Sequence, residues 1–206
     1  LCFKYEGCEK DILKNINFTW GKGERIALVG SNGSGKTTLV KLLLRLYDPT
    51  SGEITLNGEN IKCFNIRDYR EQYSTVFQDF KVFSLNIKEN VLLRITEDGD
   101  DELVTSALKE SGVYDKVSTI DNGLDAILTR EFDDKGTNLS GGEGQKIAIA
   151  RVFAKPFELI IMDEPAAGLN DSETAELTET IKMIRDKFGV TILLVEHDMG
   201  LVMNVC

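Results

Sequence analysis

The residues that could do chemistry begin with a glycine-rich stretch that follows the pattern G-x-x-x-x-G-K-[ST]. The stretch is Gly30-Ser31-Asn32-Gly33-Ser34-Gly35-Lys36-Thr37, between a short apolar run and a run of helical character. Glycines at this spacing let the backbone curl so that its N–H groups point at a phosphate chain, and the helix start adds partial positive charge. Lys36 would reach the β- and γ-phosphates, and the Thr37 hydroxyl would hold Mg²⁺. The flanking strand and helix disfavour the alternative, an ordinary glycine turn.

A pair of carboxylates, Asp163-Glu164, directly follows the apolar run at residues 159–162. Adjacent carboxylates at the carboxyl end of a core strand are costly unless a cation meets them, and a Mg²⁺-nucleotide would supply that cation. Asp163 would hold the metal, directly or through water, and Glu164 would polarise the attacking water. The apolar run before the pair disfavours the alternative, two exposed acids in a loop.

Single polar residues follow two other predicted strands. Gln78 comes directly after residues 74–77, and His197, the only histidine of the chain, follows residues 190–195 and Glu196. Because ligands bind beyond the carboxyl ends of the strands in an α/β sheet, both residues are candidates for a site. His197 could donate a hydrogen bond to a γ-phosphate. A surface glutamine and a structural histidine remain as alternatives.

A second place for an anion is predicted at Ser140-Gly141-Gly142-Glu143, which opens a helix that extends to about residue 154. A serine and two glycines at a helix start can form a nest of N–H groups, although a simple helix-capping serine is the alternative. Near the start of the chain, Tyr5 could stack on a base or merely pack on a sheet, and the residues alone favour neither.

The remaining pattern describes the elements that must hold these residues. Apolar runs at 25–29, 159–162 and 190–195 are typical of buried parallel strands. We also predict two strands within residues 1–20, strands at 53–57 and 74–77, and helices at 36 to about 47, 66–72 and 172–187. The expected fold is α/β, with a mostly parallel sheet, an N-terminal antiparallel β subdomain and an inserted helical subdomain. Residues 1–206 would form one domain, with its core at 1–78 and 141–206 and its helical part at 79–140.

Composition narrows the class of protein. With 206 residues and 42% hydrophobic content, the chain can bury the core of one domain. Its net charge of −10 disfavours a protein whose main function is to grip nucleic acid, although a small basic patch is compatible with it. No apolar run approaches the roughly 18 residues of a membrane span, so a partner or another segment would do any crossing. Reduced thiols are expected for Cys2, Cys8, Cys63 and Cys206.

Taken together, these motifs resemble those of the ATP-binding-cassette (ABC) ATPases, the nucleotide-binding domains of ABC transporters. The resemblance covers nearly the whole chain, and the motifs stand in the family's order. The matching positions are the adenine-stacking aromatic Tyr5, Walker A at 30–37, the Q-loop glutamine Gln78, the signature sequence at 139–143, Walker B at 159–164 and the switch histidine His197.

The resemblance implies ATP and Mg²⁺ as cofactors. It assigns nucleotide binding to Tyr5, residues 30–37 and Thr38, metal binding to Thr37, Gln78 and Asp163, and catalysis to Lys36, Gln78, Glu164 and His197. It implies a head-to-tail dimer with a second ABC ATPase domain, identical or different, whose nucleotide is covered by Ser140, Gly141, Gly142 and Glu143. It also implies transmembrane partners, ATP hydrolysis that powers transport, and a place at the cytoplasmic face of the cell membrane, with no nucleic-acid partner.

Within the family the resemblance is divided. Up to about residue 164 the chain is similar to exporters, through residues 77–80, 83–90 and 131–136. From residue 165 onward, residues 166–170 and 195–203 are similar to ATPases of branched-chain amino acid importers. A natural recombinant, an engineered hybrid or a computed sequence would each explain the division. Asn170 stands where most members have an aspartate that serves communication between the two sites.

Two other function classes compete with a transporter ATPase. A soluble, non-transport ABC ATPase would be expected to carry tandem cassettes, coiled-coil insertions or basic surfaces, which this sequence lacks. A regulator that binds nucleotide without hydrolysing it is disfavoured because both Glu164 and His197 are in place.

Overall fold

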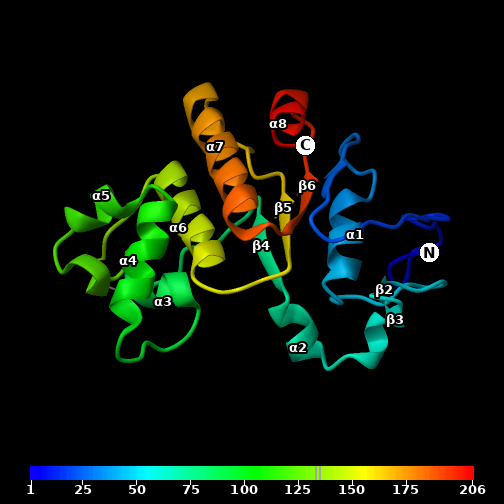
Figure 1. Cartoon of the computed structure of the whole chain (residues 1–206), viewed down its shortest axis with the longest axis horizontal. Helices are drawn as coiled ribbons and strands as arrows, with labels where there is room; N and C mark the ends of the chain where they lie inside the picture. Colours follow the sequence, from blue (N-terminus) through cyan, green and yellow to red (C-terminus); the bar gives the residue numbers. More distant parts are fainter. Residues whose placement is uncertain (133, 135) are drawn as a thin grey trace. The chain divides into compact units, whose positions relative to one another are not determined.

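The computed structural model of the chain describes residues 1–132, 134 and 136–206. Its contacts divide the chain into two compact units, and each is described here by itself. The first unit contains Leu1–Thr75, Phe157–Ala167 and Ile181–Cys206, and the second contains Val76–Pro156 and Gly168–Thr180 (Figure 1). Part of the predicted exporter-like stretch at 131–136 lies outside the described residues.

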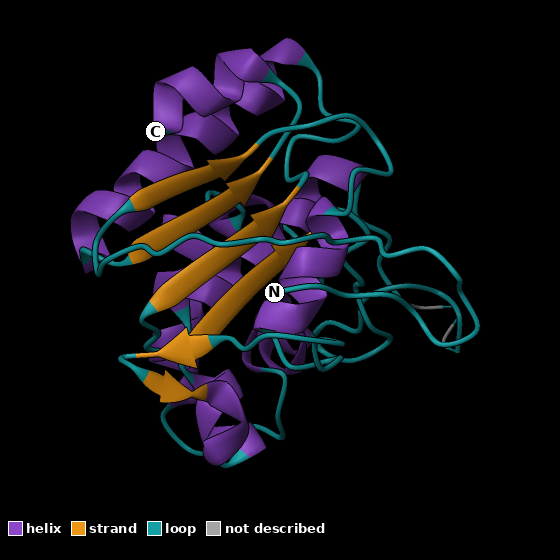
Figure 2. Cartoon of the chain, turned by 90° about the vertical axis from the view of Figure 1, so that its right-hand side faces the viewer, coloured by secondary structure: helices purple, strands orange, loops and turns teal. Residues whose placement is uncertain are grey.

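A parallel sheet forms the centre of the first unit. Among the described residues its strand order is β1-β6-β5-β4, and Figure 2 shows these strands side by side. Their bounds are Arg25–Leu28 for β1, Tyr73–Phe77 for β4, Leu159–Asp163 for β5 and Thr191–Val195 for β6. Strands β5 and β6 are buried along their whole length, as continuous apolar runs in a parallel sheet should be. The predicted parallel sheet is therefore confirmed.

The register of this sheet brings three strand ends to one level. Leu28 at the end of β1 pairs with Val195 at the end of β6. Val195 in turn pairs with Asp163 at the end of β5. Since the strands are parallel, the segments that leave them emerge together at one edge, where ligands bind in α/β proteins.

Helices of the first unit follow the predicted order, with one shorter than expected. Their bounds are Lys36–Leu43 for α1, Ile61–Cys63 for the 3₁₀ helix η1, Ile66–Glu71 for α2 and Met199–Val205 for α8, while α7 spans Asp171–Phe188 and belongs to both units. Helix α1 stops before the predicted residue 47 because side chains of α2 take up its last carbonyls. The Tyr69 hydroxyl donates to the Leu43 carbonyl (2.6 Å), and Arg70 Nε donates to the Leu44 carbonyl (3.0 Å).

The antiparallel part of the first unit is smaller than predicted. It is a hairpin of β2 (Thr55–Leu56) and β3 (Glu59–Asn60), joined by Asn57-Gly58, with both turn residues at positive φ. The two regular strands expected within residues 1–20 are wrong, since that segment forms only isolated bridges such as Phe3 with Leu13. A strand needs a neighbour for its N–H and C=O groups, and an alternating pattern does not supply one.

The second unit is a helical cluster with its own core. Its helices are α3 (Ile87–Leu92), α4 (Asp100–Glu110), α5 (Tyr114–Ser118), the 3₁₀ helix η2 (Gly123–Asp125) and α6 (Gly141–Phe153). Ile147 and Ala150 of α6 are fully buried in this core beside Val104 and Leu108 of α4. By its contacts α6 thus belongs with the helical unit, which differs from the predicted boundary at residue 140.

Two further expectations concern membranes and thiols. Among the described residues, no helix is both long enough and apolar enough to cross a bilayer. The four cysteines are all free thiols, as predicted from their spacing.

Candidate nucleotide-binding site

The glycine-rich loop between β1 and α1 has the backbone that a phosphate cradle requires. Gly33 and Gly35 have φ values of +79° and +95°, and residues other than glycine rarely adopt such values. A Cβ on Gly35 would lie 2.8 Å from the Leu13 side chain, and a Cβ on Gly30 would lie 2.9 Å from Ser34 Oγ. Local conformation and close packing therefore both demand glycine in this loop.

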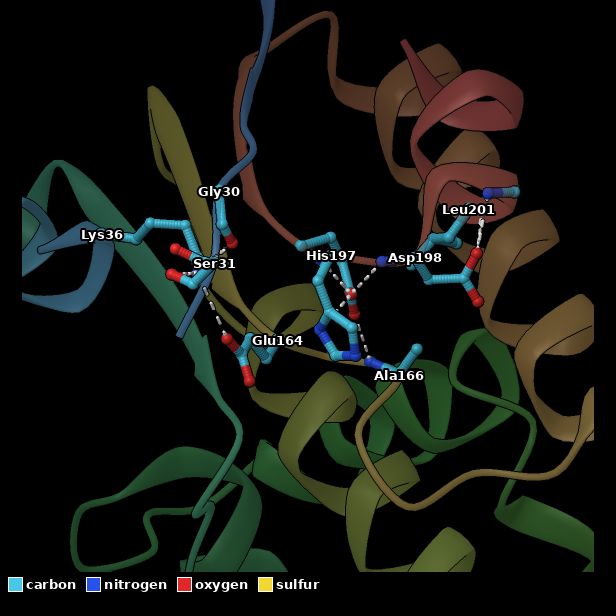
Figure 3. Close-up of polar contacts among 10 residues, drawn as sticks. Gly30, Ser31, Lys36, Glu164, Ala166, His197, Asp198 and Leu201 are labelled. Atoms are coloured by element: carbon cyan, nitrogen blue, oxygen red, sulfur yellow. Dashed lines mark hydrogen bonds and ion pairs between the residues drawn. The ribbon is translucent and has the colours of Figure 1, made fainter. Parts of the chain in front are cut away.

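Lys36 is a nearly buried cation at the mouth of the loop, with 9% of its side chain exposed. Its Nζ donates to the carbonyl oxygens of Gly30 (2.9 Å) and Ser31 (3.3 Å) (Figure 3). The same atom lies 3.8 Å from Glu164 Oε1, whose side chain is 17% exposed. A cation held in this way is placed to meet an anion that enters the loop.

Glu164 sits at a bend in the chain just beyond β5. Its backbone N–H donates to the Val195 carbonyl (2.8 Å), so the pairing with β6 continues one residue past the strand. Its φ is +48°, an uncommon conformation for a residue with a side chain. Residues held in such conformations often cluster at functional sites, where the surrounding structure compensates the cost.

Asp163 and Thr37 offer the oxygen ligands that Mg²⁺ prefers. Asp163 is only 5% exposed, whereas Thr37 is exposed at the start of α1. No cluster of three or more His, Cys, Asp or Glu side chains within the described part of the chain could hold a metal by itself. This donor set fits Mg²⁺, which binds one or two protein groups together with phosphate oxygens and water.

His197 follows β6 on the loop that leads to α8. Its side chain is 60% exposed, while its backbone N–H donates to Glu196 Oε2 (2.9 Å). Figure 3 shows His197 on the segment that leads to Asp198, the residue that caps α8. Glu196 was not among the predicted site residues, although a carboxylate directly after a fully apolar strand is the same signal that singled out Asp163.

Tyr5 packs among aromatic rings close to the start of α1. Its ring centroid lies 5.0 Å from that of Phe3 and 5.2 Å from that of Tyr47, both nearly perpendicular to it. Its hydroxyl shares a hydrogen bond with Thr38 Oγ1 (3.3 Å). Tyr5 is therefore attached to the helix that carries Lys36 and Thr37, at the level of the glycine-rich loop.

The second predicted anion site lies in the other unit, at the start of α6. Ser140 caps the helix reciprocally with Glu143: the Glu143 N–H donates to Ser140 Oγ (3.2 Å), and the Ser140 N–H donates to Glu143 Oε2 (2.8 Å). This backbone N–H, with help from Lys116, holds the pKa of Glu143 below its ordinary value. The Ser140 hydroxyl also interacts with the Glu143 carboxylate and contributes to the same lowering of its pKa.

The remaining predicted residues of the second unit lie at the ends of other elements. Gln78 is exposed directly after β4. Asn170 caps α7, since its Oδ1 accepts from the Glu173 N–H (3.0 Å) and its N–H donates to Glu173 Oε2 (2.9 Å). A Cβ on Gly142 would lie 2.8 Å from Glu173 Oε1, the far end of a flexible side chain that can move aside.

A buried asparagine of the second unit and an arginine that contacts it were not singled out by the sequence pattern. The Asn90 side chain is fully buried, accepts from the Phe83 N–H and donates to three carbonyls in the segment after Gln78. Arg151 of α6 donates to the carbonyls of Asn90 (2.9 Å) and Lys81 (2.6 Å). Together they fix the chain that follows the glutamine, a role that only the folded contacts reveal.

Comparison with known proteins agrees with this geometry. The family model described as ABC transporter matches residues 13–167. Proteins of Staphylococcus aureus strains COL and Mu50, each named a putative multidrug export ATP-binding/permease protein, are 37% identical over 199 residues. These alignments cover 96% of this chain and 33% of each relative, so the chain spans about a third of the length of the curated relatives.

A solved structure gives the same result for the fold. The structure of a bacterial Atm1-family ABC exporter with ATP bound is similar with a TM-score of 0.84 and 27% sequence identity. The match covers 98% of this chain and 34% of that chain. The similarity therefore extends past residue 167, into the part whose local sequence resembles importer ATPases.

Proposed function

The chain belongs to the ABC transporter family, and from this premise we propose that it binds and hydrolyses ATP to power transport through membrane partners. The main observation in support of the proposal is that the carboxyl ends of β1, β5 and β6 lie at the same level of the sheet. This arrangement brings the loop that holds Lys36, the acidic Asp163-Glu164 pair and the segment of His197 to one edge of one sheet.

ATP would bind with its phosphates on the loop at residues 30–37. The inward N–H groups and the buried Lys36 supply the positive potential, and Tyr5 supplies an aromatic surface for the base. Thr38 positions Tyr5 through their shared hydrogen bond. The net charge of −10 does not oppose this binding, because local dipoles and a buried cation act at much shorter range than scattered surface acids.

Mg²⁺ would be held by Asp163 and Thr37, both residues of the first unit. When bound, the ion neutralises charge on the β- and γ-phosphates. Glu164 would orient the attacking water and accept its proton, while Lys36 stabilises the oxygens of the transferred phosphoryl group. His197, exposed at the same edge, would donate a hydrogen bond to the γ-phosphate.

A second copy, or a related domain, would complete the site. The Ser140 hydroxyl and the N–H groups of Gly141 and Gly142 form an anion-binding helix start, which would cover ATP held by the other subunit. Because the named relatives are export ATP-binding/permease proteins, we propose export through transmembrane domains, with this chain at the cytoplasmic face of the membrane.

A mixing experiment tests the shared site. Lys36→Ala removes the cation of the phosphate loop but leaves the start of α6 unchanged. Ser140→Asp leaves the phosphate loop unchanged and places a negative charge, which repels ATP, at the start of α6, while aspartate can still cap that helix. Each variant alone should release no phosphate from Mg²⁺-ATP, but the mixture should recover activity. In a mixed dimer, the intact phosphate loop of the Ser140→Asp chain meets the intact helix start of the Lys36→Ala chain. Ser140→Asn is the neutral control for the cap.

Two results would contradict the proposal. If the unmodified chain releases no phosphate with Mg²⁺-ATP at high protein concentration, the assignment of hydrolysis is wrong. If the unmodified chain is active and the mixture of folded variants stays inactive, the site is not shared between two molecules.

A further inference from the structure

Glu196 is a buried carboxylate that the mechanism above does not use. It stands between β6 and His197 and is 1% exposed. Its Oε1 accepts from the Ala166 N–H (3.0 Å), and its Oε2 accepts from the N–H groups of His197 (2.9 Å) and Asp198 (3.2 Å). A buried carboxylate is costly unless such donors surround it, and here both oxygens have them.

These bonds join two loops that carry different parts of the site. Ala166 lies on the segment after Glu164, and His197 begins the segment that leads to α8 (Figure 3). The Glu196 backbone N–H also donates to the Leu28 carbonyl at the end of β1 (3.2 Å), just before the phosphate loop. The residue is thereby bonded to all three strand ends at the edge of the sheet.

We propose that Glu196 is a positioning residue that sets the main chain of His197 and fixes it to the loop of Glu164. It acts through backbone N–H groups rather than through the imidazole, because His197 Nδ1 lies 3.6 Å from Glu196 Oε2, beyond a hydrogen bond. It is not a catalytic base, since both oxygens are engaged and the side chain is buried. The proposal rests on the function proposed for His197.

Glu196→Gln is the matched variant. Glutamine has the same size but only one acceptor oxygen, so its NH₂ group must face N–H donors on one side or the other. The two loops can then no longer be held by the same side chain. Asp198→Asn is the control: Asp198 accepts from Gly200 and Leu201 as the cap of α8, and asparagine caps helices equally well.

Glu196→Gln should change the turnover of ATP much more than the affinity for ATP. We expect Glu196→Gln to lower kcat for phosphate release by about 10- to 100-fold, the usual effect of a displaced catalytic group, with ATP affinity by calorimetry changed less than about threefold. Asp198→Asn should retain both. If Glu196→Gln does not fold by its thermal transition, Glu196→Asp, which keeps the charge with a shorter reach, takes its place.

A double-variant cycle separates positioning from general stability. In a His197→Ala chain, adding Glu196→Gln should lower kcat no further, since the residue through which it acts is already gone. A further loss that multiplies the first, or an equal loss of ATP affinity, would overturn the positioning role. If Glu196→Gln turns over normally while His197→Ala is inactive, the positioning role of Glu196 is overturned and the proposed function stays intact. Normal turnover of His197→Ala would instead refute both.

Discussion

Replacing Glu164 with glutamine should separate the binding of ATP from its hydrolysis. The substitution removes one negative charge and keeps the size of the side chain. In the present structure this carboxylate lies 3.8 Å from Lys36 Nζ, with both side chains largely buried. Glutamine therefore removes the base that would accept a proton from water, and also the group that shares Lys36 with an incoming phosphate.

The two effects have different sizes. A general base contributes about 10²- to 10⁴-fold to a rate, so we expect kcat to fall by at least about 100-fold. At the 3.8 Å distance between Lys36 and Glu164, unit charges attract by about 4 kcal/mol at an effective dielectric constant of about 20. Desolvation offsets most of this attraction. A net of about 1 kcal/mol released to the phosphate would tighten ATP binding by about fivefold.

Phosphate release and calorimetry in Mg²⁺-ATP measure the two quantities on the same protein. Glu164→Gln should also accumulate as an ATP-bound dimer by light scattering, because the complex no longer breaks down. Glu158→Gln is the control, since that side chain is 60% exposed in a surface ion pair with Lys22. Turnover above a tenth of that of the unmodified chain, or ATP affinity reduced by tenfold, would refute the roles given to Glu164.

Four further outcomes follow from single contacts. Lys36→Ala should abolish measurable ATP binding by calorimetry, because the loop loses its buried cation; unchanged affinity would remove Lys36 from the site. Asn90→Ala should cost about 2–4 kcal/mol in urea unfolding, since several buried backbone groups lose their partner; a loss below about 0.5 kcal/mol would mean that water replaces it. Gly142→Ala should slow phosphate release at least about tenfold with α6 intact by circular dichroism, because the added methyl group would stand on the helix start proposed to cover ATP; an unchanged rate would argue against close approach there. Folding lowers the pKa of Glu143 from its ordinary value of 4.5. The charged Glu143 side chain therefore stabilises the fold at pH values above 4.5, and this stabilisation is lost as the pH falls below 4.5. The difference in Tm between the unmodified chain and Glu143→Gln should therefore shrink from pH 6 to pH 4, and a constant difference would contradict this.

Continuous apolar runs were the most reliable guide to the fold. The runs that became β5 and β6 are buried on both faces, so their sequence depends on little besides the sheet itself. The alternating residues Ile16, Phe18 and Trp20 carry an equally clear pattern, yet they form no strand. In the structure the backbones of Ile16 and Leu1 exchange hydrogen bonds, while Phe18 and Trp20 stack on each other with centroids 5.0 Å apart.

The candidate site was predictable where its residues stand at the boundaries of recognisable elements. Lys36 begins α1, while Glu164 and His197 follow β5 and β6, and the register of the sheet brings the ends of β1, β5 and β6 to one level. Glu196 and Asn90 were not predictable, because their importance comes from backbone groups distant in sequence. Ala166 is 30 positions from Glu196, and no local pattern announces that contact.

Charge at this site must be counted group by group. The chain carries a net charge of −10, and Asp163, Glu164 and Glu196 lie at the edge where a polyanion would bind. These three carboxylates differ in their surroundings, since Glu196 is neutralised by three backbone N–H groups and Glu164 lies against Lys36. We propose Asp163, the last residue of β5 and 5% exposed, as the metal ligand, and a bound metal ion would reverse its effect on an incoming phosphate. With Asp163 in that role, we expect this edge to favour ATP together with its magnesium ion over a bare polyphosphate, which would meet Asp163 without the cation.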